Sequence, residues 1–277
     1  MTTAPHPPDG SPTAGPGAGR PVALVTGASG GIGEELARQA ALDGHDLVLV
    51  ARSRDRLDHL AAELERAGAG VEVLTADLQT DAGIGAVADR LTATGSPVVD
   101  VLVNNAGYGS VGAFAELSPD GLAGEITLNI MALMRLTRAA LPGMLHRRRG
   151  GILNVASLAS FLPGPGMANY SATKAYVLSL TEAIREEVTG SGVRITALCP
   201  GYTRTGFQER AGVRTQGLSG PAWQSAPEVA AAGWAGFRRG DDVVVPGIYN
   251  KISVSTIRLT PRPLVRKVAA TSIRRLH

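Results

Sequence analysis

Tyr170 and Lys174 stand four residues apart in the segment NYSATKAY, residues 169–176. On a helix this spacing places both side chains on the same face. A free phenol titrates near ~10, and an ammonium a few ångströms away favours the phenolate and lowers that pKa. Lysine is scarce in this chain, because it occurs only at 174, 251 and 267 against a Lys+Arg total of 27. We therefore predict a proton donor and acceptor here; the simpler alternative is a surface lysine beside a half-buried tyrosine.

Three further motifs end apolar runs along the chain. Ser157 ends GILNVAS (151–157), NNAG occupies 104–107, and CPGYTRT occupies 199–205. The carboxyl ends of parallel strands meet at one edge of a sheet, where ligands bind. At that edge the Ser157 hydroxyl would hydrogen-bond a substrate carbonyl. We expect the three motifs and Tyr170 to face one crevice.

The turn TGASGGIG, residues 26–33, follows an apolar run and opens a helical pattern. Its glycines let the backbone approach a pyrophosphate closely, and the following helix N-terminus supplies free N–H groups. The spacing Gly27, Gly31, Gly33 differs from the G-x-G-x-x-G fingerprint, and no Gly-Lys-Ser/Thr ending marks a P-loop. The turn predicts a bound dinucleotide; a tight connection between strand and helix is the alternative.

The segment LVARSR, residues 49–54, bears on the choice of cofactor. A carboxylate at the end of this run would accept hydrogen bonds from an adenosine ribose and favour NAD(H). Arg52 stands there instead, and an arginine pairs with a 2′-phosphate, so NADP(H) is preferred. Asp55 lies close enough to the end of this run that NAD(H) remains an alternative cofactor. Arg54 and Arg56 also fit a solvated first helical turn.

Short β-branched runs alternate with longer helical patterns. The runs are VALVT (22–26), DLVLV (46–50), VEVLT (71–75), VDVLV (99–103), GILNVAS (151–157), VRITALC (193–199) and DVVVP (242–246). Helical patterns end near Asp43, Ala67 and Thr94, and longer ones run from about Pro119 to Leu145 and from about Tyr170 to Thr189. This order predicts an α/β fold, a Rossmann-type doubly wound parallel sheet of about seven strands in three α/β/α layers.

The chain divides into three predicted parts. Residues 1–20 are rich in Pro, Gly, Ser and Thr, which predicts a disordered tail, and residues 21–247 hold every predicted strand in one catalytic domain. Residues 248–277 predict a basic amphipathic extension, since 251–277 carry seven Lys or Arg and no acidic residue. Subtracting these seven from the net charge of +3 leaves −4 for residues 1–250. A nucleic-acid binder would spread positive charge over its folded body, so we expect no nucleic-acid partner.

Composition excludes several other classes. The single Cys199 forms no internal disulfide, and no Cys and His cluster at metal-ligand spacing exists. No apolar run approaches the ~20 residues that span a bilayer, and the N-terminus lacks an apolar signal core. We predict no metal site and a cytoplasmic location.

Taken together, TGASGGIG, NNAG, Ser157 with Tyr170 and Lys174, and CPGYTRT resemble the short-chain dehydrogenase/reductase family in its single-domain form, over about residues 21–247. The resemblance implies hydride transfer between a nicotinamide and a carbonyl or alcohol, with Tyr170 as acid and base and Lys174 on the nicotinamide ribose. It also implies that Asn129 completes a catalytic tetrad and anchors a proton-carrying water. The family commonly forms dimers and tetramers through helices corresponding to 119–145 and 170–189.

The same resemblance implies a set of cofactor contacts. Asp77 would contact adenine, and the Pro-Gly turn with Thr203 and Thr205 would hold the nicotinamide amide. The full set of expected cofactor-binding residues is Gly27, Ser29, Gly31, Ile32, Gly33, Arg52, Asp77, Leu78, Asn104, Ala106, Gly107, Tyr170, Lys174, Pro200, Gly201, Thr203 and Thr205.

The sequence says less about the substrate and about the role of the extension, residues 248–277. A hydrophobic carbonyl compound is expected from side chains that could line the pocket: Gly107, Tyr108, Phe161, Met167, Tyr202, Phe207 and Trp223. The irregular stretch from Tyr202 to about Ser225 suggests a lid or binding loop. The extension would touch an anionic membrane surface, close over the active site, or pack on the body or a partner subunit.

Two other functions stay open. One is a non-catalytic NAD(P)-binding regulator or scaffold, which has no need of Asn129, Ser157, Tyr170 and Lys174 together. The other is a nucleotide-sugar epimerase or dehydratase of the family's extended branch, for which a longer C-terminal substrate domain and a different glycine spacing are expected.

Overall fold

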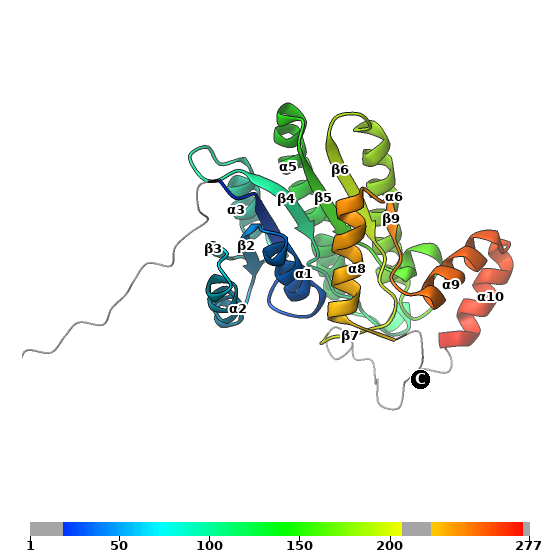
Figure 1. Cartoon of the computed structure of the whole chain (residues 1–277). Coiled ribbons are helices and arrows are strands. Elements are labelled where there is room, and N and C mark those ends of the chain that lie inside the picture. The colour runs from blue at the N-terminus through cyan, green and yellow to red at the C-terminus, as the bar shows by residue number, and fades with distance from the viewer. Residues whose placement is uncertain (1–18, 207–222, 274–277) are drawn as a thin grey trace, which may run out of the picture.

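The computed structural model describes residues 19–206 and 223–273. Seven strands form one sheet in the order β3-β2-β1-β4-β5-β6-β9, and every neighbouring pair is parallel (Figure 1). The strands are β1 (Val22–Thr26), β2 (Asp46–Ala51), β3 (Val71–Thr75), β4 (Val99–Asn104), β5 (Gly150–Val155), β6 (Val193–Leu198) and β9 (Val243–Val244). The predicted doubly wound parallel sheet is confirmed.

Helices cover both faces of the sheet and give three layers. On one face pack α1 (Gly31–Leu42), α2 (Arg54–Arg66) and α8 (Ala226–Arg239), with a core that joins Leu36, Leu57 and Trp234. On the other face pack α3 (Asp81–Thr92), α5 (Leu133–Arg147) and α6 (Ala168–Glu187), with a core that includes Ile84 and Leu136. Because both faces are covered, strands such as β1 are buried at every residue, which explains their continuous apolar sequence.

The strand order reverses at β1, which pairs with β2 on one side and with β4 on the other. Their helices leave toward opposite faces, so a crevice opens beyond the carboxyl ends of β1 and β4. The TGASGGIG turn follows β1 and the NNAG motif ends β4, and both motifs therefore lie at this crevice.

The sequence predicted one long helix from about Pro119 to Leu145. The structure does not form one regular helix there. The segment consists of α4 (Pro119–Ile126), a π-helical segment η2 (Thr127–Ala132) and α5. The wider turns of a π-helix often occur at functional sites. Asn129 lies in this segment, and its amide is bonded to groups outside the helix.

Residues 226–239, which received no predicted range, form α8. Ser225 caps this helix through a capping box with Glu228, and a proline stands in the first turn. The sequence S-x-x-E before an apolar pattern was therefore the missed signal. Before α8, a two-stranded sheet pairs β7 (Thr203–Arg204) with β8 (Gln224–Ser225).

The extension forms two helices, α9 (Ile248–Leu259) and α10 (Arg262–Ile273), which lie beyond β9 at the edge of the molecule (Figure 1). Val254 of α9 is buried beside Cys199 and Val245, so this helix packs on the body. The predicted disordered tail lies outside the described residues except for its last two. Within the two described ranges, no helix is both long and apolar enough to cross a membrane.

Candidate active site

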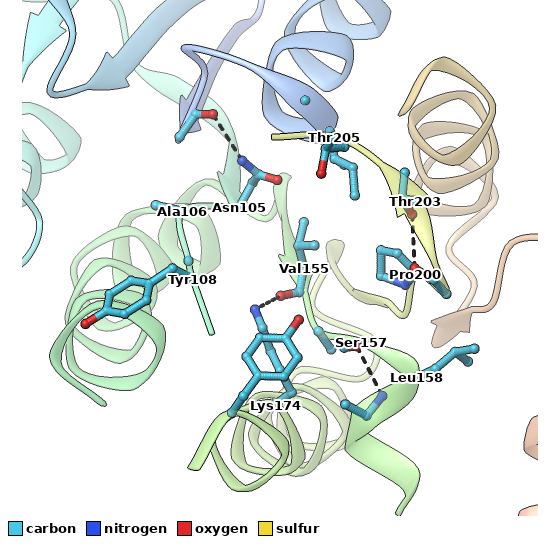
Figure 2. Close-up of a pocket in the computed structure, with 18 of the residues that line it drawn as sticks. Asn105, Ala106, Tyr108, Val155, Ser157, Leu158, Lys174, Pro200, Thr203 and Thr205 are labelled. Carbon is cyan, nitrogen blue, oxygen red and sulfur yellow. Dashed lines mark hydrogen bonds between the residues drawn. The ribbon is translucent and has the colours of Figure 1, made fainter. Parts of the chain in front are cut away.

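One cavity of about 1430 Å³ lies at the carboxyl edge of the sheet. Its walls come from the segments that follow β1, β2, β3, β4, β5 and β6, together with α6, α9 and α10. Figure 2 shows Asn105 and Thr205 on one side of this space, with Ser157 and Lys174 opposite them. The motifs that the sequence placed at one crevice thus share a single cavity.

The glycine turn brings backbone, rather than side chains, to the cavity. Gly27 has a φ of 68°, a conformation that L side chains rarely adopt. Gly33 lies behind the lining, and a Cβ there would collide with the carbonyl of Gly27. The N-cap residue Gly30 supplies no side-chain cap to α1, so the first N–H groups of this helix remain available to an anion. This cradle fits a pyrophosphate.

Two arginines line the end of the cavity beyond β2. Arg52 and Arg56 are part of the lining, whereas Asp55 is not. Arg54 is also outside it, and its Nε donates to Asp58 Oδ1 at 2.9 Å within α2. Asp77, Leu78 and Gln79 from the segment after β3 line the same end. The lining here is therefore positively charged on one side and has a carboxylate on the other.

Asn105 was not among the predicted residues, although it is the second asparagine of NNAG. Its Nδ2 donates to the carbonyl of Thr26 at 2.9 Å, and its main-chain N–H donates to Thr26 Oγ1 at 3.0 Å. These bonds fix the segment after β4 to the glycine turn after β1. Asn105, Ala106 and Gly107 all line the cavity.

Asn104 takes a different place from its neighbour. Its Nδ2 donates to Asn154 Oδ1 at 2.9 Å and to Thr137 Oγ1 at 3.0 Å, both within the protein interior. Asn154 in turn donates to Thr181 Oγ1 at 3.0 Å. The structure places Asn104 outside the lining of the main cavity, in a polar network that ties β4 and β5 to α5 and α6.

Ser157, Tyr170 and Lys174 meet at the centre of the cavity. Ser157 follows β5 and caps the short helix η3 (Leu158–Phe161), and its Oγ accepts from the N–H of Ala159 at 3.1 Å. Tyr170 and Lys174 share one face of α6, and Lys174 Nζ lies 5.8 Å from the centroid of the Tyr170 ring. The Ser157 hydroxyl and the Tyr170 phenol share a hydrogen bond. Lys174 Nζ also donates to the carbonyl of Val155 at 2.8 Å (Figure 2).

Burial dominates the ionisation of this group. Tyr170 is 8% exposed, and burial raises its pKa to about 12, although the bond to Ser157 acts in the opposite direction. Burial likewise lowers the pKa of Lys174 to about 8. The sequence predicted a lowered pKa for Tyr170 because it counted the nearby ammonium; the structure gives the opposite direction because the phenol is desolvated. The Glu125 carboxylate adds to the rise of the Tyr170 pKa and opposes the lowering of the Lys174 pKa.

Asn129 lies behind the cavity wall. Its Nδ2 donates to the carbonyl of Tyr108 at 2.8 Å and to Thr173 Oγ1 at 3.0 Å, and its Oδ1 accepts from the N–H of Tyr108 at 3.1 Å. The side chain is 1% exposed and outside the lining. Asn129 therefore joins the segment after β4 to α6.

The Pro-Gly turn after β6 closes another side of the cavity. Pro200, Gly201, Thr203 and Thr205 all line it, and Thr203 Oγ1 donates to the carbonyl of Gly201 at 3.1 Å (Figure 2). Of the remaining predicted cofactor residues, Gly27, Ser29, Gly31 and Ile32 line the cavity as well.

The remaining wall is largely apolar. Tyr202 and Trp223 stack at 5.3 Å between ring centroids, and both line the cavity with Tyr108 and Met167. Phe161, also predicted there, lies outside the lining and holds the Arg258 guanidinium 5.1 Å from its ring centroid. Phe207 lies outside the described residues.

Side chains of the extension complete this wall. The sequence offered closure over the active site as one alternative for the extension, but it named none of the lining residues. They are Asn250, Ser253, Val254, Thr256, Ile257, Thr260 and Val265. The helical spacing of Asn250, Val254 and Ile257 was the available signal, because it puts these three on one face. The inner face of α9 therefore belongs to the cavity.

Comparisons with known proteins agree with this geometry. The family model for short chain dehydrogenases matches residues 21–215. A ketoacyl reductase of the granaticin polyketide synthase from Streptomyces violaceoruber is 38% identical over 232 residues, which cover 82% of each chain.

Two solved structures are also similar to this chain. A short-chain dehydrogenase from Sphingobium yanoikuyae, in complex with NADPH, has a TM-score of 0.79 and 38% identity, and the match covers 86% of this chain and 93% of that one. The bulky-bulky ketone specific alcohol dehydrogenase from Comamonas testosteroni has a TM-score of 0.74 and 33% identity, with the same coverage.

Proposed function

This chain belongs to the short-chain dehydrogenase family, and from that premise we propose that it is an NADP-preferring oxidoreductase that reduces a bulky hydrophobic carbonyl. The observation that carries the proposal is the shared cavity. Ser157, Tyr170 and Lys174 line the same space as the glycine turn that would hold a pyrophosphate. A scaffold without turnover has no need of this arrangement.

The proposed chemistry follows from the two hydroxyl groups. When bound, the cofactor supplies a hydride from its nicotinamide ring to the carbonyl carbon. Ser157 donates a hydrogen bond to the carbonyl oxygen and positions it, and Tyr170 transfers its phenolic proton to that oxygen as the C–H bond forms. Alcohol oxidation runs through the same steps in reverse, with Tyr170 taking the proton.

Lys174 and Asn129 support this step. The Lys174 ammonium, already bonded to the Val155 carbonyl, has two further N–H donors that would hold the nicotinamide ribose. Its positive charge would also stabilise the phenolate that Tyr170 becomes once it has given up its proton. Asn129 keeps α6 in register with the segment after β4 through its bonds to Tyr108 and Thr173. Its role as the anchor of a proton-carrying water rests on the family resemblance.

The preference for NADP(H) rests on the arginines beyond β2. Arg52 and Arg56 line the cavity while the nearby carboxylate Asp55 does not. Within the described part of the chain, neither arginine forms an ion pair, so both guanidinium groups are available to a 2′-phosphate. The NADPH complex of the Sphingobium relative supports the same preference.

The substrate class rests on the apolar wall. The stacked Tyr202 and Trp223, together with Val254 and Ile257 of α9, leave room for a large hydrophobic group beside the reacting carbonyl. The similar proteins named as a ketoacyl reductase and as a dehydrogenase of bulky ketones support a ketone rather than a small aldehyde.

Turnover with a matched pair of tyrosine variants tests the proposal. NADPH consumption would be followed with bulky ketones, 3-oxoacyl thioesters and small aldehydes. We expect Tyr170→Phe to lower kcat by about 10²- to 10⁴-fold, while Tyr176→Phe, on an exposed face of the same helix, leaves it unchanged. NADPH binding without turnover on any substrate of the panel would favour the regulator instead.

The assembly is a separate proposal. Ile126, Met131 and Tyr176 are large apolar side chains exposed on α4, η2 and α6. We propose a homodimer or homotetramer in which these helices meet a second copy, as the family resemblance implies. Light scattering after size exclusion would test it, and a monomeric mass at micromolar concentration would contradict it.

The outer face of the extension supports peripheral contact with an anionic membrane. Ile248, Tyr249, Ile252, Leu259 and Leu264 are exposed, and Lys251, Arg262, Arg266 and Lys267 are exposed among them. Apolar and basic side chains together suit an anionic lipid surface. Pelleting with phosphatidylglycerol vesicles but not phosphatidylcholine vesicles is expected, and equal, negligible pelleting would contradict the proposal. A cytoplasmic location stays a prediction from the sequence.

A further inference from the structure

The later part of the extension shapes the cavity without being buried itself. Ile257 of α9 lines the cavity, and so do Thr260, which follows this helix, and Val265 of α10. Among the described residues of the extension, no side chain beyond Val254 is buried. A segment with so few buried contacts opens easily from the body of a protein. Another contact must therefore hold this part of the wall in place.

The start of α9 is held by its own anchors. Asn250 is 3% exposed, and its Nδ2 donates to the carbonyl of Pro246 at 2.9 Å and to Gln224 Oε1 at 3.1 Å. Val254, one turn later, packs in the same apolar cluster as Cys199. Because these anchors lie in the first two turns of the helix, they do not hold its end.

Arg258 provides the contact at the end of α9. The Cζ atom of its guanidinium lies 5.1 Å from the centroid of the Phe161 ring, and its Nη2 lies 3.7 Å from Glu182 Oε1. A guanidinium within about 6 Å of a ring centroid is attracted to the face of the ring. Phe161 belongs to η3 and Glu182 to α6. The Arg258 side chain thus joins the end of α9 to two elements of the catalytic body, while it stays outside the cavity lining.

The segment η3 is tied directly to catalytic residues. Ser157 caps it by accepting from the N–H of Ala159, and Ser160 Oγ donates to the carbonyl of Lys174 at 2.8 Å. These bonds fix the Phe161 ring relative to the Ser157 hydroxyl and to α6. A guanidinium held on that ring therefore also fixes how closely the α9 wall approaches the reacting groups.

We propose that Arg258 is a positioning residue that clamps the end of α9 onto η3 and thereby sets the preference for bulky substrates. Without this clamp, Ile257 and Val265 would lose their fixed distance from the reacting carbonyl. A large substrate would then lose apolar contacts that a small substrate never makes. The substrate preference rests on the proposed function; the clamp itself requires neither cofactor nor substrate.

Hydrogen exchange followed by mass spectrometry tests the clamp in the full-length protein without ligand. The Arg258 side chain is more than half exposed, so Arg258→Ala is expected to fold. This variant should speed amide exchange in the second half of α9 about fivefold, while exchange in α6 and at the start of α9 stays unchanged. Arg258→Lys keeps a cation near the ring and should restore most of the protection. Unchanged exchange in Arg258→Ala, or equal acceleration along the whole of α9, would overturn the proposal.

Two carboxylates on α6 give a matched pair of variants. Glu182→Gln removes the ion pair and leaves the ring contact, so it should speed exchange at the end of α9 by less than Arg258→Ala does. Glu186→Gln removes the same charge from an exposed position one turn later and should change nothing. Acceleration by Glu186→Gln as large as that by Arg258→Ala would assign the effect to general charge and contradict the clamp.

Kinetics then test the effect on substrate choice. In Arg258→Ala the KM for a bulky ketone should rise about fivefold at unchanged kcat, whereas the KM for a small aldehyde and the Kd of NADPH stay the same. Arg258→Lys should recover most of this loss. Adding Phe161→Leu to Arg258→Ala should raise the KM no further, because both changes break one contact. A rise in KM that is equal for both substrates, or additive effects of the two changes, would overturn the proposal.

The two experiments separate the clamp from the proposed function. Absence of turnover with every carbonyl would contradict the proposed function, and the exchange experiment would still decide whether Arg258 holds α9. Turnover of a bulky ketone with unchanged exchange in Arg258→Ala would contradict the clamp and leave the proposed function standing.

Discussion

The cofactor half of the cavity and its substrate half are built in different ways. The cofactor half, from residues 21–107, holds its shape through backbone contacts such as the packing of Gly33 on Gly27. The substrate half, from Tyr202, Trp223 and α9, depends on side chains, and it leaves Tyr202, Ile248 and Ile252 largely exposed. A wall made of backbone tolerates few substitutions, whereas substitutions in a wall made of side chains can change which ligand the cavity accepts. The difference suggests that the chemistry is fixed at one end and the specificity set at the other.

A substitution in the glycine turn should break the cofactor half completely. In Gly33→Val the added side chain would collide with the Gly27 carbonyl and with Asn105, so a backbone shift is unavoidable. We expect a loss of about 3 kcal/mol in unfolding free energy and no measurable NADPH binding. Chemical denaturation and fluorescence titration measure the two effects.

The matched control lies in another helix of the same half. Gly85 of α3 has open space where a Cβ would stand, so Gly85→Ala should stabilise the protein by about 0.5–1 kcal/mol. Normal NADPH binding by Gly33→Val would show that the backbone cradle does not hold the cofactor.

The preference for NADPH over NADH should depend on Arg52, a side chain at the edge of the cofactor half. Arg52→Ala removes a guanidinium from the cavity lining, and we expect NADPH affinity to fall about tenfold while NADH affinity stays the same. Arg54→Ala is the control, because Arg54 pairs with Asp58 outside the lining. Equal weakening of both nucleotides would assign Arg52 to general attraction instead of recognition of the 2′-phosphate.

A change in α9 should affect the substrate half alone. Ile257→Ala removes an apolar contact from the cavity wall, so KM for a bulky ketone should rise about fivefold. NADPH affinity and turnover of a small aldehyde should be unaffected. Ile252→Ala, on the exposed face of the same helix, should have no effect. A parallel change in NADPH affinity would mean that the two halves are coupled.

Lys174, the buried lysine where the cofactor half and the substrate half meet, should make the unfolding free energy depend on pH. Its folded pKa is about 8 against an ordinary value of 10.5, so between these values the unfolded chain binds more protons. Unfolding free energy should therefore rise from pH 8 to pH 10, by at most about 1.4 kcal/mol per pH unit. Lys174→Met should remove this part of the slope in denaturation experiments. An identical slope in both proteins would mean that Lys174 keeps an ordinary pKa.

Sequence reasoning succeeded best where short-range patterns decide the structure. The apolar runs and the TGASGGIG turn indicated the parallel sheet and the edge at which the cavity lies, because the apolar pattern of a strand and the geometry of a glycine turn are local properties. Tyr170 and Lys174 were paired by helical spacing alone.

The features that sequence reasoning missed depend on packing between residues that are far apart in the chain. The pKa of Tyr170 depends on burial and on Glu125, which lies 45 residues earlier in the chain. Asn104 and Asn105 are adjacent, yet one enters an interior network and the other holds the glycine turn. For α9, closure over the active site was one of several alternatives from the sequence, and its docking beside β9 is what places it at the cavity.

The most direct test of the account follows the hydride itself. The wild-type enzyme would reduce a bulky ketone with NADPH that carries deuterium at both nicotinamide C4 positions, and mass spectrometry would examine the alcohol product. The account predicts an alcohol with one deuterium on the former carbonyl carbon. It also predicts that Tyr170→Phe forms this alcohol far more slowly than the wild-type enzyme does. An unlabelled alcohol, or full activity in Tyr170→Phe, would contradict it.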